Sequence, residues 1–149
     1  MAISSAICSS FKQELLQGKH SLDTSGNGGD TFKLAMYTSS ASLDATTTAY
    51  ATGNEISGSG YSAGGATLTN TGVGLNSTTA FTDFSDISFT SASFTANGCL
   101  IYNTTTAGGS GTTNAVCVIA FGGDKTVSSG TFTIQFPTNE SSSAIIRLT

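Results

Sequence analysis

This chain contains unusually few charged residues. Asp, Glu, Lys and Arg together make up 9% of its 149 residues, whereas soluble domains average roughly 25%. Charged side chains normally keep a free domain soluble. The surface is therefore expected to consist largely of hydroxyl, glycine and asparagine residues, or to be hidden in part against other protein. Apolar residues still make up 38% of the chain, too many for a disordered tail.

Basic residues are few and scattered, which excludes a nucleic-acid-binding surface because phosphate binding needs a concentrated cationic face. The five are Lys12, Lys19, Lys33, Lys125 and Arg147, and the formal net charge is −4. Long apolar runs are missing as well. The longest, residues 115–121, is far shorter than the roughly 20 residues of a membrane-spanning helix. The first residues lack a basic segment followed by an apolar run, so we predict no signal peptide and no membrane partner.

Side chains that perform catalysis or bind metals are also scarce. The chain has one histidine, His20, and no tryptophan. No Gly-x-Ser-x-Gly elbow occurs at a strand–helix turn, and the chain has no Cys-x-x-Cys pair and no paired-histidine spacing. His20 is therefore predicted to be a solvent-exposed loop residue. We therefore predict that the protein is not an enzyme and has no cofactor.

The cysteines number three, Cys8, Cys99 and Cys117, and an odd number is not a disulfide framework. Cys99 and Cys117 lie in apolar runs and are predicted to be buried, reduced thiols. A cross-strand disulfide between them is the alternative.

Two acidic segments have a structural and a functional interpretation. Residues 23–30, DTSGNGGD, resemble the start of a calcium-binding loop, but the twelfth position is Leu34, where such a loop needs glutamate. A plain loop is favoured, with calcium binding as the alternative.

Asp83 and Asp86 would point to opposite faces of an extended strand unless a bulge intervenes. Turn or edge roles are favoured over a pair of catalytic carboxylates.

A short amphipathic helix is predicted at residues 5–17. Ile7, Phe11 and Leu15 recur every four residues and form one apolar stripe, and Gly18 is suited to end the helix. A helix this short is marginal alone and must pack against other structure. Two hypotheses stay open for the stripe: it docks on a partner or neighbouring copy, or it covers the protein's own sheets.

The rest of the chain has the pattern of short strands separated by turn residues. Strands are expected at 31–38, 45–52, 81–89, 93–103, 115–121, 130–136 and 144–148. Residues 130–136 alternate strictly between apolar and polar, as in a half-exposed strand. Turn signals at 122–125 and 128–130 predict that 115–121 pairs directly with 130–136.

Seven or eight short strands predict an all-β fold, a β-sandwich or jelly-roll-like domain. We accordingly divide the chain into an N-terminal helical segment, residues 1–20, and a β-sandwich domain, residues 21–149.

Several phrases of the sequence are specific enough to suggest a family. They are FKQELLQGKH, DTFKLAMYTSSASLDATTTAY, GNEISGSGYSAGG, FTDFSDISFTSASFTANGCLIYN, VCVIAFGGDKTVSSGTFTIQFP and AIIRL. In this order they resemble a family of small virion structural proteins of tailed bacteriophages, over most of residues 11–148.

The resemblance implies a non-enzymatic virion protein, and capsid decoration (cement) is the role that it favours. The implied partners are the major capsid protein and further copies of the chain, with a trimer expected by analogy with local threefold axes. The implied location is the outer capsid surface of the virion, after synthesis in the cytoplasm of the bacterial host.

Two alternative functions remain. One is another virion component, such as a head fibre base, a neck protein or a tail protein. The other is a glycan-binding module for host attachment, which would need exposed aromatic side chains. Tyr61 and Tyr102 are the candidates for that role. The alternative interpretation is that both are half-buried tyrosines of strands.

Overall fold

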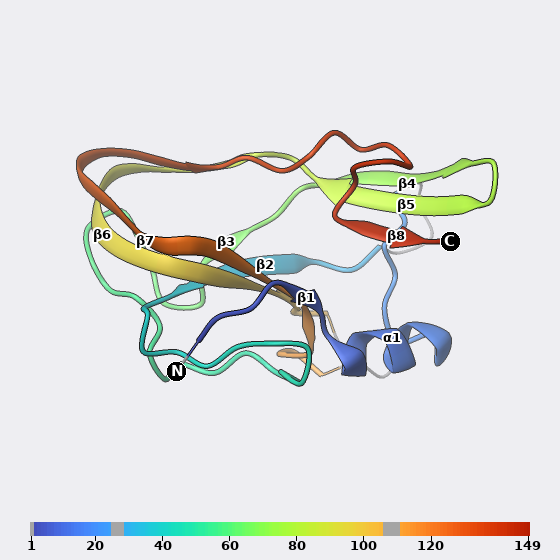
Figure 1. The fold of residues 1–149 in the computed structure, drawn as a ribbon, viewed down its shortest axis with the longest axis horizontal. Helices are drawn as coiled ribbons and strands as arrows, with labels where there is room; N and C mark the ends of the chain where they lie inside the picture. Colours follow the sequence, from blue (N-terminus) through green and yellow to red (C-terminus); the bar gives the residue numbers. More distant parts are fainter. Residues whose placement is uncertain (1, 25–28, 106–110) are drawn as a thin grey trace.

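The computed structural model describes residues 2–24, 29–105 and 111–149. Its strands form two antiparallel sheets, with one short helix near the N-terminus (Figure 1). The elements are β1 (Ala6–Ile7), α1 (Ser9–Leu16), β2 (Phe32–Tyr37), β3 (Ala66–Thr67), β4 (Asn70–Asn76), β5 (Thr79–Phe84), β6 (Ile87–Asn103), β7 (Ala115–Ile134) and β8 (Ile146–Leu148). The larger sheet has the order β1-β7-β6-β2-β3 and the smaller one β4-β5-β8. This architecture confirms the predicted all-β domain with a helix near its N-terminus.

Strands β6 and β7 form one long hairpin that dominates the larger sheet. Their register runs from Ile87 opposite Ile134 to Tyr102 opposite Ala115, with several shifts along the way. Such bulges bend a strand pair, and the hairpin curls back on itself at the left of Figure 1.

The predicted pairing of 115–121 with 130–136 is wrong, because residues 115–121 and 130–134 belong to the single strand β7, which pairs with β6. The glycines between them do not end the strand. Gly122 and Gly123 have φ angles of 74° and 137°, which glycine adopts at little cost, and the strand bends there and continues.

Strand β2 lies between β6 and β3 and is buried on both faces, as the apolar run at 31–38 predicts. From one face, Phe32 contacts Phe84 of β5, with ring centroids 5.7 Å apart. On the opposite face of the same sheet, the Tyr102 ring of β6 stacks on the Tyr50 ring, with ring centroids 4.6 Å apart. The larger sheet is thus packed between the smaller sheet and the chain segment that precedes β3.

Two expected strands differ from the structure. Residues 45–52 form no strand and make only an isolated bridge between Ala49 and Asn114, because the segment crosses over the sheet and does not extend it. Residues 81–89 are not one bulged strand: β5 ends at Phe84 and β6 begins at Ile87. Asp86, in the break, accepts a hydrogen bond from the backbone N–H of Phe136 at 2.8 Å.

The helix begins later than predicted, at Ser9, because the residues before it join the larger sheet. Ala6 pairs with Val118 and Ile7 with Cys117 of β7. Gly18 has a φ of 72° and follows the last turn, as expected. Within the described ranges, no helix has the length and apolar character needed to cross a membrane.

Candidate interaction surfaces

The structure separates the three residues of the predicted interaction stripe. Phe11 is 1% exposed and belongs to the central hydrophobic core. Ile7 lies in β1, outside the helix, and is partly buried against the same core. Leu15 is also partly buried, and it lines a hollow that opens beside β8. Phe11 therefore serves internal packing, and the binding of a partner by the stripe stays a prediction.

An apolar surface that the sequence analysis missed is formed by the smaller sheet. Its register gives two rows of opposed side chains: Val73, Thr82 and Ile146, then Leu75, Ala80 and Leu148. Directly opposed residues of antiparallel strands project from the same face. We call Val73, Leu75, Ala80 and Leu148 the hairpin face.

The outer part of the hairpin face is open to solvent. Leu75 is 73% exposed, Val73 57% and Leu148 55%. Where it approaches α1, a hollow of about 50 Å³ is lined by Leu15 and Leu22 together with residues of β4, β5 and β8.

The exposed apolar residues gather at one end of the molecule. Leu16, at the end of α1, is 92% exposed, and α1, β4, β5 and β8 all lie at the right of Figure 1. Among the described residues, this end contains every large hydrophobic side chain that is exposed. Large exposed apolar patches on a soluble domain mark interaction sites, so this end is the candidate interaction surface.

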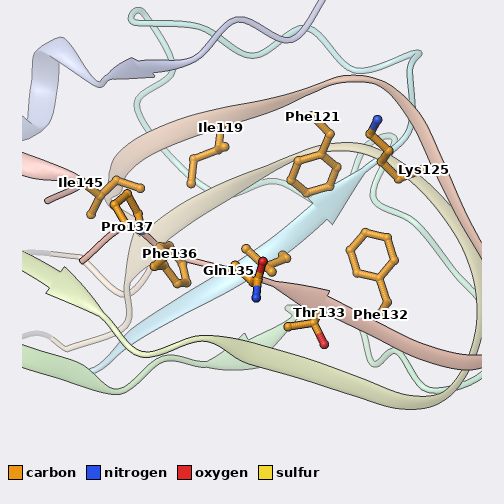
Figure 2. A pocket seen from close by; sticks show the side chains of 10 residues that line it. Ile119, Phe121, Lys125, Phe132, Thr133, Gln135, Phe136, Pro137 and Ile145 are labelled. Carbon is orange, nitrogen blue, oxygen red and sulfur yellow. The ribbon is translucent and has the colours of Figure 1, made fainter. Parts of the chain in front are cut away.

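A second apolar feature is a cleft of about 570 Å³ between the two halves of β7 (Figure 2). Ile119 and Phe121 line one side, and Phe132 and Phe136 lie across from them, with ring centroids of Phe121 and Phe132 6.1 Å apart. The predicted alternation of 130–136 is confirmed, since Ile134 is buried whereas the polar residues between the apolar ones are exposed. The lining holds one charged side chain, Lys125, and is otherwise mostly apolar, so the cleft offers mainly apolar contact.

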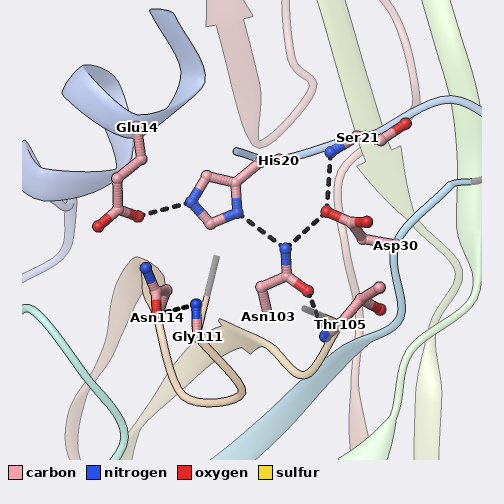
Figure 3. Close-up of polar contacts among 8 residues, drawn as sticks. All are labelled: Glu14, His20, Ser21, Asp30, Asn103, Thr105, Gly111 and Asn114. Carbon is pink, nitrogen blue, oxygen red and sulfur yellow. Dashed lines mark hydrogen bonds and ion pairs between the residues drawn. The ribbon is translucent and has the colours of Figure 1, made fainter. Parts of the chain in front are cut away.

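The histidine is not the exposed loop residue that the sequence predicts. The His20 side chain is fully buried, and its Nε2 lies 2.6 Å from Oε2 of Glu14 (Figure 3). On the other side of the ring, Nδ1 lies 2.9 Å from Nδ2 of Asn103. The sequence prediction fails because residues distant in the chain enclose His20: it lies between Glu14 of α1 and Asn103, the last residue of β6.

The hydrogen bonds of Asn103 indicate which ring nitrogen of His20 is the donor. The Asn103 amide donates from Nδ2 to Asp30 Oδ2 at 2.7 Å, and its Oδ1 accepts from the Thr105 N–H at 2.8 Å. Since Nδ2 also faces His20, Nδ1 must accept and the ring proton must lie on Nε2, where it is donated to Glu14. Both ring nitrogens are therefore engaged in hydrogen bonds with other parts of the fold.

A second polar cluster surrounds Glu55. One carboxylate oxygen accepts from the Tyr50 hydroxyl at 2.7 Å, and the other accepts from the Tyr61 hydroxyl at 2.6 Å and the Gly64 N–H at 2.7 Å. Burial and the Glu55 carboxylate raise the pKa of Tyr50 to about 12, and they raise the pKa of Tyr61 still further. This carboxylate therefore ties together three positions of the segment between β2 and β3.

The two glycan-binding candidates lie inside this packing. Tyr102 is 4% exposed, and its hydroxyl donates to the Gly64 carbonyl at 2.6 Å. Tyr61 is partly buried and also accepts from the Met36 N–H at 3.0 Å. Neither ring is the exposed aromatic platform that sugar stacking would use.

The cysteines are free and buried, which confirms the predicted reduced thiols and rules out the Cys99–Cys117 disulfide in this structure. Burial, with the negative charges of Asp44 and Glu14, raises the pKa of the Cys8 thiol to about 11. Burial also raises the pKa of Cys99 and Cys117. Nucleophilic thiols need a lowered pKa and access, so these three are packing residues.

The acidic segments serve structure where they are described. Asp83 is buried and accepts hydrogen bonds from the backbone N–H groups of Phe84 and Ile145. Asp86, between β5 and β6, accepts the hydrogen bond from the Phe136 N–H described above. The predicted turn or edge role fits Asp86, but it is wrong for Asp83, which lies in the central strand β5 and is buried because its carboxylate serves backbone N–H groups inside the fold. The possible calcium loop at 23–30 includes residues 25–28, which lie outside the described residues, and Leu34 is buried in β2. Within the described ranges, no cluster of three metal-binding side chains occurs.

No family model, no curated protein and no solved structure matches this chain.

Proposed function

We propose that this protein is a non-enzymatic structural component of a tailed-bacteriophage virion that decorates the outer surface of the capsid. The observation that carries the proposal is the apolar end of the domain, where Leu16, Val73, Leu75 and Leu148 are 55–92% exposed. The chain that displays these side chains has only 9% charged residues. Such a surface suits a protein whose apolar side chains are covered by neighbouring proteins in an assembly.

The energetics of this surface favour a repeated contact. Full burial of one Val or Leu side chain contributes roughly 1.5–3 kcal/mol, and association costs on the order of 4–15 kcal/mol in lost freedom. The four side chains therefore support modest binding by one copy. Several copies bound to neighbouring capsid subunits would strengthen each other through effective concentration.

The polar clusters support a non-enzymatic role. His20, Glu55 and the cysteines are the side chains best suited to catalysis, and each is buried or engaged in hydrogen bonds that hold segments of the fold together. The proposed partners are the major capsid protein and other copies of this chain. The proposed location is the particle surface, reached after synthesis in the host cytoplasm.

Binding to heads that lack this protein tests the proposal. The purified chain and its Leu75→Asp and Leu16→Asp variants are mixed with such heads and sedimented, with Ser128→Asp as the control at an exposed position of β7. We expect saturable binding by the parent and the control, and binding at least about tenfold weaker for the two apolar-end variants. Failure of the folded parent chain to bind any heads would contradict the proposal.

Copy number separates decoration from the other virion roles. A neck, tail or fibre-base protein would use the same apolar end but would be present in a few copies set by the symmetry of a ring. Decoration requires many copies in proportion to the major capsid protein. Quantitative mass spectrometry of purified particles measures this ratio, and a low ratio would favour the neck or tail role.

A further inference from the structure

Strand β4 is an edge strand with one open side. It pairs with β5 only, and within the described residues no strand pairs with its outer edge. The turn between Asn76 and Thr79 closes the hairpin, and the residues that flank such a turn share a hydrogen-bonded pair. Hydrogen-bonded pairs then alternate, so the backbone N–H and C=O groups of Val73 and Leu75 point away from β5 toward the open edge.

The open part of this edge lacks the usual protection against strand pairing. Natural edges are blocked by charges, prolines, bulges or covering segments. Near Thr71 and Gly72 a register shift and the Asn139 side chain, 3.2 Å from the Gly72 carbonyl, provide such cover. At the other end of the strand, Asn76 donates from Nδ2 to Ser141 Oγ at 3.0 Å. Between these two contacts, within the described part of the chain, no hydrogen bond outside the β4–β5 pair reaches the backbone of Val73 or Leu75. Residues 70–82 contain no charged residue and no proline.

We propose that a second copy of this chain adds its β4 to this edge, antiparallel and related by a twofold axis at Gly74. Val73 of each copy then lies opposite Leu75 of the other, and their outward backbone groups form hydrogen bonds across the axis. The two smaller sheets become one continuous sheet. The apolar hairpin faces of both copies lie side by side on the same surface of that sheet.

Several features favour a second copy over another partner. The residues with outward backbone groups, Val73 and Leu75, flank Gly74 symmetrically, so the strand is complementary to itself. Two copies with a net charge of −4 would meet along a segment free of charge. Gly74 has no side chain at the axis, and the space above it is taken by the Phe81 ring, since a Cβ on Gly74 would lie 2.4 Å from the ring's Cζ.

The size of the contact determines how stable the pair is. One short strand edge buries less than the roughly 800 Å² per partner of a standard interface, so we expect a dimer that dissociates on dilution. A twofold contact is closed and stops at two copies, in contrast to the expected trimer. Pairing in solution does not depend on capsid binding, although it would double the apolar surface presented to a shell.

Sedimentation equilibrium of the full chain over a range of concentrations tests the pairing. Val73→Lys places a charge at the open edge, and Leu148→Lys places the same charge on the hairpin face at the other edge of the sheet. We expect dimers for the parent and Leu148→Lys, and at least about tenfold weaker association for Val73→Lys. A parent chain that stays monomeric at all concentrations, or equal weakening by both variants, would overturn the proposal.

Disulfide trapping tests the register. Opposed residues of a hydrogen-bonded antiparallel pair have Cα atoms about 5.5 Å apart, within the range that a disulfide spans. An equimolar mixture of Val73→Cys and Leu75→Cys chains should therefore form mixed disulfide dimers faster than either variant alone, and equal rates would exclude an axis at Gly74. If the chain binds heads but stays monomeric, only the pairing proposal is wrong. If it forms dimers but does not bind heads, only the decoration proposal is wrong.

Discussion

Nε2 of His20 lies 2.6 Å from Oε2 of Glu14, and this contact joins α1 to the end of β6 through Asn103. The pair brings together a helix residue, the segment that follows the helix and a strand from the middle of the chain. It explains how so short a helix stays attached to the sheet, together with the burial of Phe11, whose ring lies 4.9 Å from the imidazole.

Replacement of His20 by leucine should destabilise the fold by roughly 1–3 kcal/mol, because hydrogen-bonding groups of Glu14 and Asn103 lose their partner in a buried site. Lys12→Ala, at an exposed position on the same helix, is the control and should change stability by less than about 0.5 kcal/mol. Urea unfolding followed by circular dichroism measures both. Equal stability of the two variants would contradict a structural role for His20.

The tyrosines should make the protein sensitive to alkali. Burial raises the pKa of all four, and that of Tyr50 reaches about 12, above the value near 10 of an unfolded tyrosine. The unfolded state therefore releases these protons first, so their contribution to stability is complete below pH 10 and is lost as the pH rises through the folded pKa values.

We expect no phenolate absorbance from the folded protein at pH 10, and an unfolding free energy that falls steadily above that pH. Tyr50→Phe removes one titrating group and should make this fall less steep. Absorbance titration combined with urea unfolding at several pH values provides the measurement. A tyrosine that ionises near pH 10 while the circular dichroism spectrum stays native would show that the cluster around Glu55 is open to solvent.

The thiols should be unreactive until the protein unfolds. The pKa of Cys8 is raised to about 11, and Cys99 and Cys117 are buried and have raised pKa values. We expect negligible reaction with a thiol reagent at neutral pH and full reaction of the cysteines in urea. Leu16→Cys, at a position that is 92% exposed, is the positive control and should react at once. Rapid labelling of the native parent would contradict the burial of these residues.

Two glycines with nearly equal φ angles should differ greatly in tolerance to alanine. Gly65 has a φ of 75°, and a Cβ there would lie 1.8 Å from the Leu34 carbonyl oxygen. Gly122 has a φ of 74°, and nothing lies within 4 Å of its Cβ position. Gly122→Ala should cost about 1–2 kcal/mol from the left-handed backbone alone. Gly65→Ala should cost several kcal/mol more because the backbone of β2 must move, and similar melting temperatures would refute this packing.

The aromatic cluster at the bend of the hairpin should show a graded response. Phe94 is 6% exposed, whereas Phe132 is only partly buried at the cleft, with ring centroids 5.1 Å apart. Phe94→Ala should destabilise by roughly 3–5 kcal/mol. Phe132→Ala should cost about half as much, since part of its ring already faces solvent. Chemical unfolding of both variants checks the order, and a larger loss at Phe132 would show that the cleft is closed in solution.

Much of the fold class was predictable because its signals are local. The alternation at 130–136 and the apolar run at 31–38 each report on neighbouring residues, and both segments have the burial that their patterns indicate. The smaller sheet was harder to predict. Its strand β4 contains only two large apolar residues among glycine, asparagine and threonine, so the apolar–polar alternation is weak. The spacing of Val73 and Leu75, followed by a turn at Ser77, is the sequence signal that could have indicated this strand.

The sequence alone determined that this is an all-β protein with one short helix, few charges and buried thiols, because composition and periodicity act over a few residues at a time. Only the tertiary structure decided the partners of β7, the burial of His20 and the exposure of Val73 and Leu75. Glycines such as Gly122 suit a turn and a bulge equally well, and whether a side chain meets solvent depends on segments far away in the chain. The candidate surface is therefore a property of the assembled sheets.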